Sequence, residues 1–146
     1  MNKTLIYYKN KKNWKEIQNL LRNNSVECVT LCYGLYENNI LTLLQPLYFK
    51  NGESEYNVSV DKIALMKFLK LVHNKTNCYP CVIHNHLKYN ILKFSLPDSR
   101  FEESLNDYLN EYNKEVIMIL YGVNNDILIH SKSLGLKMGI EYENEI

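Results

Sequence analysis

Two histidines stand one residue apart in the segment "CVIHNH", and an aspartate follows after a short loop. His84 and His86 lie at i and i+2, a spacing that sends both side chains to the same face of a β-strand. Two imidazoles on one face can bind a single zinc ion, and Asp98 in "SLPD" is the candidate third ligand. Three protein ligands leave a fourth position for water, whose pKa zinc lowers towards ~7. The pattern predicts a catalytic metal site.

Water chemistry also needs a base, and the chain offers an acid at the head of an apolar strand. Glu27 opens the segment "ECVTLCYGLY". It is distant from the histidines in sequence, but a sheet can bring it next to them. We expect its carboxylate to accept a proton from the activated water and pass it to a leaving amine. Ser95, three residues before Asp98, can donate a hydrogen bond to the oxyanion.

In chain order, these residues resemble the signature of the JAMM (MPN-plus) zinc metalloproteases. The matching positions are Glu27 and Gly34, then His84, Asn85 and His86, then Ser95 and Asp98. The resemblance runs from about Trp14 to Ser131. The chain differs from the usual pattern at three points: eight residues rather than seven separate the second histidine from the serine, Leu87 replaces a proline, and Thr30 replaces a glycine.

The resemblance implies a role for each matching residue. Glu27 would be the general base, Ser95 the oxyanion-stabilising hydroxyl, and His84, His86 and Asp98 the ligands of Zn²⁺. It also implies cleavage of a peptide or isopeptide bond at the C-terminus of a ubiquitin-like or sulfur-carrier protein, whose extended tail would add to a strand edge. The chain has no long insertion after Asp98, so it looks like the compact prokaryotic or viral form.

Two other functions stay open at this point. One is a catalytically inactive MPN-type scaffold for protein assembly, a class that typically loses the acid, the histidine pair and the aspartate. The other is a RadC-like accessory protein of DNA metabolism. The histidine pair with Asn85 between its members also resembles the site pattern of that branch.

Hydrophobic periodicity predicts the elements that would position these residues. We expect helices over 13–24, 58–74 and 97–113, and strands over 4–8, 26–36, 40–49, 81–86, 115–122, 126–131 and 136–143. Ser59 or Asp61 would cap the second helix, whose buried face would carry Ile63, Met66 and Leu69. This order favours an α+β or α/β sandwich, a mixed sheet flanked by helices. The resemblance implies the JAMM/MPN, cytidine-deaminase-like form of it.

Composition narrows the class of protein. The 146 residues are 46% hydrophobic and 23% charged, which fits one globular domain over residues 1–146. A net charge of +1 gives no reason to expect nucleic acid as a partner. No apolar run approaches the ~18 residues of a membrane span. No export signal is visible, so we expect a cytoplasmic protein with reduced cysteines.

Some patterns have competing interpretations. Cys78 and Cys81, with the histidine pair, could form a closed Cys2His2 zinc site. The odd separation of Cys81 and His84 argues against this, because it places the two side chains on opposite faces of a strand. The tripeptide "HNH" alone does not indicate a nuclease. The simpler alternatives are a solvated strand-start acid for Glu27, a metal-free polar strand end for the histidines, a helix cap for Asp98 and a loop hydroxyl for Ser95.

Overall fold

The computed structural model describes residues 3–23, 25–52, 60–87 and 92–142. Within these ranges the strands are β1 (Lys3–Tyr8), β2 (Cys28–Glu37), β3 (Ile40–Leu43), β4 (Tyr48–Asn51), β5 (Tyr79–Asn85), β6 (Ile117–Tyr121), β7 (Ile127–Ser131) and β8 (Gly135–Glu141). The α-helices are α1 (Lys11–Asn23), α2 (Lys62–Lys70) and α3 (Leu96–Leu109), and short 3₁₀ turns follow α2 at Leu71–Asn74 and α3 at Asn110–Tyr112. The predicted element ends at 24, 58 and 143 and the candidate cap Ser59 lie outside the described residues.

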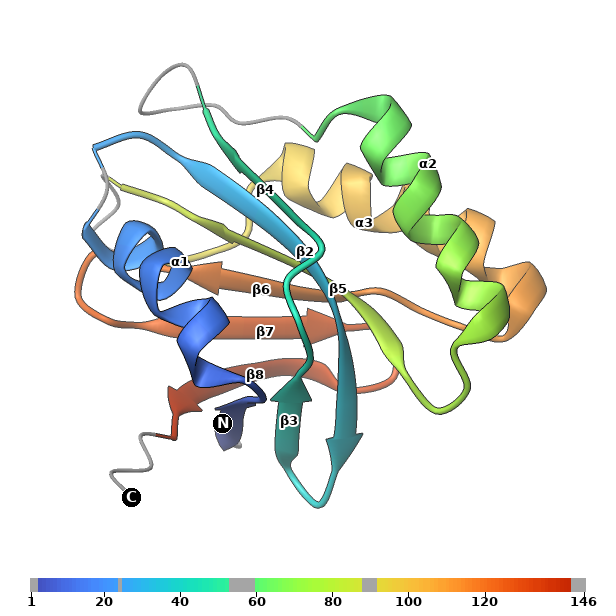
Figure 1. Ribbon diagram of the computed structural model, residues 1–146, viewed down its shortest axis with the longest axis horizontal. Coiled ribbons are helices and arrows are strands. Elements are labelled where there is room, and N and C mark those ends of the chain that lie inside the picture. Colours follow the sequence, from blue (N-terminus) through green and yellow to red (C-terminus); the bar gives the residue numbers. More distant parts are fainter. Residues whose placement is uncertain (1–2, 24, 53–59, 88–91, 143–146) are drawn as a thin grey trace.

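Seven strands close into a mixed barrel. The strand order is β3-β1-β8-β7-β6-β5-β2-β4, and an additional pairing of β3 with β2 closes the ring, which leaves β4 as an outer strand on β2 (Figure 1). The predicted α/β sandwich, an open sheet flanked by helices in the JAMM/MPN-like manner, is therefore wrong. The structure is a barrel that carries three small helices.

The closure depends on the length of β2. Its first half, from Cys28 to Leu31, pairs with β4, and its second half, from Gly34 to Glu37, pairs with β3. The predicted strand 40–49 is in fact two strands, which pair with these two halves. Side chains alternate between two faces in an open sheet and in a barrel alike. Periodicity therefore predicted the strands but could not reveal that they form a ring.

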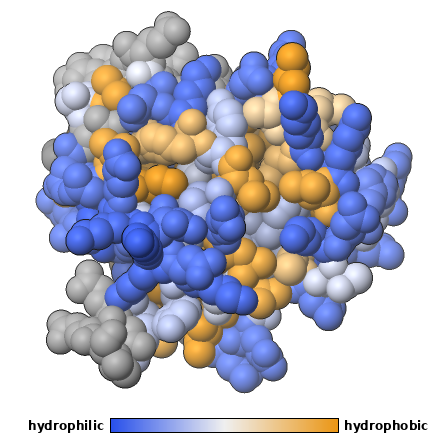
Figure 2. All heavy atoms as spheres, in the orientation of Figure 1, coloured by the Kyte–Doolittle hydropathy of each residue, from blue (hydrophilic) through white to orange (hydrophobic). Residues whose placement is uncertain are grey.

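The barrel has an inner and an outer apolar core. The inner core contains the inward side chains of the strands, together with Trp14 and Leu21 of α1. The outer core lies between β2, β5 and β6 and the two other helices, which contribute Phe68 and Leu69 of α2 and Leu105 and Leu109 of α3. Figure 1 shows α2 and α3 together, on the other side of β2 and β5 from α1. Hydrophilic side chains gather over α1 in Figure 2.

All three predicted helices are present, but α1 begins at Lys11 rather than 13 and α2 at Lys62 rather than 58, and one helix has a different buried face from the predicted one. Asp61 caps α2 by accepting a hydrogen bond from the backbone N–H of Ala64. The predicted buried face of α2 is wrong at two of its three positions, because Ile63 is 68% exposed and Met66 is 49% exposed, whereas Leu69 is buried as predicted. The helix is rotated so that Phe68 packs on the barrel instead. Within the described ranges, no helix reaches the length and apolarity that a bilayer crossing needs.

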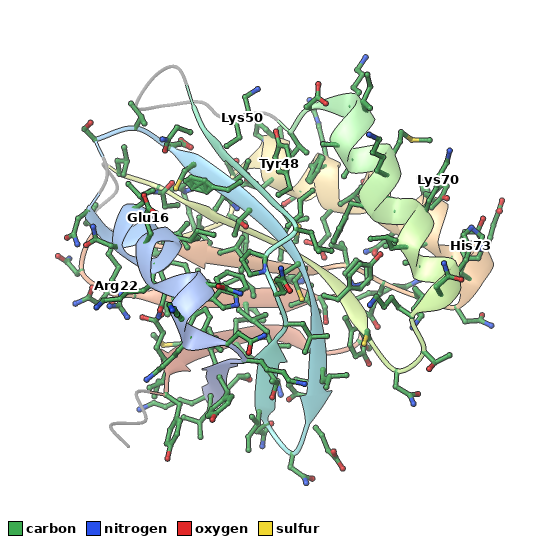
Figure 3. All side chains as sticks on the ribbon, viewed as in Figure 1. Glu16, Arg22, Tyr48, Lys50, Lys70 and His73 are labelled. Atoms are coloured by element: carbon green, nitrogen blue, oxygen red, sulfur yellow. The ribbon has the colours of Figure 1, made fainter. Side chains whose placement is uncertain are left out.

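A buried carboxylate ties α1 to the barrel. Glu141 of β8 accepts hydrogen bonds from the Tyr8 hydroxyl at 2.7 Å, the Tyr121 hydroxyl at 3.0 Å and the Gln18 amide at 2.7 Å. It also forms an ion pair with Arg22, which Figure 3 labels on α1. These contacts come from two strands and two turns of the helix. They fix the C-terminal end of α1, which lies next to the end of β5 that carries the histidines.

Candidate metal centre

The histidine pair is on the outer face of the barrel. Along β5, the side chains of Cys81 and Ile83 belong to the inner core, whereas that of Val82 belongs to the outer core. His84 continues the outward series, and His86 follows it directly beyond the strand. The two imidazole rings have centroids 5.2 Å apart, and both residues are 6% exposed. The predicted placement of both histidines on one face is confirmed.

The first turn of α3 brings Asp98 to this face. Ser95 is the N-cap residue, and its hydroxyl oxygen accepts the backbone N–H of Asp98 at 3.2 Å. In return, the Asp98 carboxylate accepts the backbone N–H of Ser95 at 2.8 Å, which completes a capping box. This cap holds the carboxylate so that Oδ1 lies 3.1 Å from Nε2 of His84 and Oδ2 lies 3.2 Å from Nε2 of His86.

The three side chains fit a metal ion. One ligand atom from each of His84, His86 and Asp98 lies within 4.8 Å of the others. Two ligands of a tetrahedral ion at about 2.1 Å are ~3.4 Å apart, close to the carboxylate–imidazole distances of 3.1 Å and 3.2 Å. Nε2 of His84 is buried and forms no hydrogen bond, despite facing the carboxylate. A cation between these atoms would satisfy them, so the group could bind a metal ion.

The local charges suit such an ion. Burial raises the pKa of the Asp98 carboxyl. Its interactions with His84 and His86 and the hydrogen bond from Ser95 lower this pKa by more than burial raises it. The net result is a pKa well below the usual carboxyl range. Asp98 is thus a carboxylate at neutral pH, the form in which it can bind a cation.

Glu27 lies at the start of the strand that pairs with the histidine strand. It directly precedes β2, which is antiparallel to β5 with Val29 opposite His84. The same register carries Glu27, two residues earlier, to the position opposite His86. Glu27 is 7% exposed. The pKa of its carboxyl is raised above the usual value, mainly because the carboxyl is buried. The charge of Asp98 also raises this pKa, whereas the charges of His86 and His84 lower it. The acid therefore lies within electrostatic range of all three candidate ligands.

Asn85 was not predicted to have a role in shaping the site. Its side chain points inward between the two outward histidines and is fully buried. The amide oxygen accepts the backbone N–H of Cys28 at 2.8 Å, and the amide nitrogen donates to the carbonyl of Leu21 at 3.1 Å. These bonds join the histidine segment to the start of β2 and to the end of α1. The only signal in the sequence is a polar residue at an inward position.

Sequence reasoning also missed Phe94 and its neighbours. The Phe94 ring lies between His84, at a centroid distance of 6.3 Å, and His130, at 6.2 Å. His130 of β7 lies against α3, where its Nδ1 is 2.8 Å from Oε2 of Glu102. Phe94 follows the loop that separates the histidines from Ser95, of which residues 88–91 lie outside the described ranges.

The competing cysteine site is wrong. Cys81 points into the barrel core, where it is opposite Cys32, whereas His84 points outward. Cys78 is buried in the outer core. None of the four cysteines forms a disulfide. His73 packs edge-on against the Tyr112 ring at 4.3 Å, away from the metal group.

A cavity of about 390 Å³ borders the metal group. His84 and Asp98 form part of its wall, and apolar side chains of β2, β5, β6, α2 and α3 form most of the remainder. Two of the three candidate ligands, His84 and Asp98, therefore face a concave, mostly apolar surface, which is the usual setting of a small-molecule or substrate site.

Comparison with known proteins supports the fold alone. No protein-family model matches the chain, and no curated protein matches it. The structure is similar to the solution structure of protein DSY2949 from Desulfitobacterium hafniense, with a TM-score of 0.51 and 15% sequence identity, over 95% of this chain and 94% of that one. The kinship with the JAMM metalloproteases, which the site residues suggested, stays a hypothesis.

Proposed function

We propose that the protein is a zinc-dependent metallopeptidase that hydrolyses a peptide or isopeptide bond in a protein substrate. The observation that carries this proposal is the convergence of Glu27 with His84, His86 and Asp98. A buried acid can serve as a general base, and the buried two-histidine, one-carboxylate group beside it can bind a metal ion that activates water. A scaffold that had lost catalysis would need neither the base nor the ligands.

Zinc is the metal we propose, because two imidazoles and one carboxylate match its catalytic sites with three protein ligands. The same donors also bind iron(II) in oxygenases. Glu27 favours the hydrolytic choice, since a base next to the open coordination position serves proton transfer from water. The cytoplasm is the compartment we propose, consistent with four cysteines that form no disulfide.

Each residue has a defined task in the proposed reaction. A bound zinc ion would acidify a water molecule and polarise the substrate carbonyl. Glu27 accepts the proton of that water and returns it to the leaving nitrogen. Ser95 acts first through its backbone N–H and its hydroxyl oxygen, which position Asp98. The hydroxyl hydrogen of Ser95 remains a donor for the developing oxyanion.

The proposed substrate class is the extended C-terminal tail of a ubiquitin-like or sulfur-carrier protein, as the resemblance implies. A tail of this kind can add to an open strand edge. Among the described strands, β4 pairs only with β2, so its other edge is available. Tyr48 and Lys50 project from β4 (Figure 3). The first half of β2, to which β4 is paired, lies next to Glu27.

Metal content and cleavage test this proposal together. Purified wild type should hold about one zinc per chain by elemental analysis, and His84→Ala should hold almost none. Zinc-loaded wild type should cleave a ubiquitin-like fusion protein, whereas Glu27→Gln should keep its zinc and lose roughly 10²–10⁴-fold in rate. Glu103→Gln, an exposed acid on α3, is the matched control and should behave as wild type.

Four results would contradict the proposal. Equal cleavage by wild type and Glu27→Gln would exclude Glu27 as the base. Iron in place of zinc would point to a different chemistry. Zinc-loaded protein without cleavage would favour the scaffold, and a DNA-repair partner in place of a protein substrate would favour the RadC-like alternative.

A further inference from the structure

The cavity beside the metal group has an apolar floor made by the barrel itself. Val29 of β2, Val82 of β5 and Met118 of β6 form this floor. Val82 is directly opposite Met118 in the register of β5 and β6, and all three residues are at most 3% exposed. Because the floor belongs to three paired strands, its shape is set by the fold.

The walls of the cavity also come from regular elements. Leu65 projects from α2 and Phe101 from α3, and both are half-buried. Val60, Lys62 and Pro97 also line the cavity, and His84 and Asp98 form its side next to the metal group. A group that fills the cavity therefore contacts apolar side chains on most sides and adjoins two of the three candidate metal ligands on the other.

The size and lining of the cavity restrict its occupant. A volume of about 390 Å³ is near the lower end of the range for ligand pockets, which suits one side chain with part of the adjoining backbone. Apart from the two ligands, Lys62 at the start of α2 is the one charged residue among the described residues that line it. A charged side chain in contact with the floor would lose its hydration there, because Val29, Val82 and Met118 offer no polar side-chain partner.

We infer that this cavity binds the side chain of the substrate residue directly beside the scissile bond, and that this side chain is a bulky aliphatic or aromatic one. The inference rests on the proposed function, because it takes the bond to be held at the metal group. Burial of a leucine or phenylalanine side chain on such a floor should raise kcat/KM about 10- to 100-fold over glycine.

The test varies one residue of the substrate at a time. In the ubiquitin-like fusion protein, the residues directly before and directly after the scissile bond are changed in turn to glycine, lysine, leucine and phenylalanine. Zinc-loaded protein should prefer leucine and phenylalanine at least tenfold at one of the two positions. Equal kcat/KM for all substitutions at both positions would overturn the inference and leave the proposed function standing.

A variant in which a larger side chain fills the cavity tests whether the preference arises there. Leu65→Trp should place a larger ring in the cavity and remove the preference for leucine and phenylalanine, with no change in zinc content. Met66→Trp changes the adjacent, 49% exposed position and should keep the preference. If the preference survives Leu65→Trp, it arises elsewhere and the assignment of this cavity is wrong.

Ligand binding gives a readout that needs no catalysis. N-acetyl-leucine amide should shift the NMR methyl signals of Val29, Val82 and Met118, and N-acetyl-glycine amide should not. If zinc-loaded protein cleaves nothing, the proposed function fails. The NMR shifts still show, independently of cleavage, whether the cavity binds an apolar side chain. Shifts from the leucine amide alone support an apolar side-chain site, whereas equal or absent shifts overturn it.

Discussion

Replacing Asn85 by alanine tests how the fold holds the two histidines. The change removes two buried hydrogen bonds, one from the backbone N–H of Cys28 at 2.8 Å and one to the carbonyl of Leu21 at 3.1 Å. A buried polar group that loses its partner costs about 1–3 kcal/mol. The free energy of unfolding should therefore fall by about 2–5 kcal/mol. Zinc affinity should fall about tenfold, at the low end for residues that support metal ligands.

Urea unfolding measures the first effect. Trp14, the single tryptophan of the chain, is fully buried in the inner core, so its fluorescence reports the transition. With a slope of about 2 kcal/mol/M, the midpoint should fall by about 1–2.5 M. Asn13→Ala, at an exposed position of α1, should stay within about 0.5 kcal/mol of wild type. An equally small change for Asn85→Ala, or unchanged zinc affinity, would refute the reasoning.

Three further variants probe the barrel and the cap. A Cβ at Gly34 would lie 2.9 Å from Sγ of Cys81 and 3.1 Å from Leu41, so Gly34→Ala should lower the free energy of unfolding by about 1–3 kcal/mol in urea titrations. Ser95→Ala should cost about 0.5–2 kcal/mol and weaken zinc binding by calorimetry, because the capping box that fixes Asp98 is lost. Although burial raises the pKa of Asp98, the facing imidazoles lower it more. Its carboxylate therefore stabilises the metal-free fold above the ordinary carboxyl pKa and loses this effect as the pH falls. Asp98→Asn should accordingly cost more stability at pH 5 than at pH 2, and an equal cost at both would contradict the pKa direction.

Local patterns predicted the parts of the site that depend on short-range geometry. The i, i+2 spacing placed His84 and His86 on one face, because a strand allows no other arrangement. The Ser-x-x-Asp segment is a helix start, and its capping box is a local structure that the sequence encodes. The alternative in which Asp98 is only a cap is half right, since the same carboxylate caps α3 and faces both imidazoles.

Features that depend on contacts between distant parts of the chain could not be predicted from the sequence. Closure of the barrel depends on β2 pairing with β3 as well as β5, and an alternating pattern is the same with or without that contact. The face of α2 was partly misread, because Ile63 and Met66 have the spacing of a buried stripe but are exposed. Leu69 of that stripe is buried, and it packs together with Phe68. Partners distant in sequence likewise define the role of Asn85.

The most direct test of the central claim is anomalous diffraction at the zinc absorption edge from crystals of the zinc-loaded protein. We predict a single strong peak about 2.0–2.2 Å from Nε2 of His84, Nε2 of His86 and a carboxylate oxygen of Asp98. A zinc peak bound by other residues, or no peak at this group with zinc in excess, would contradict the account.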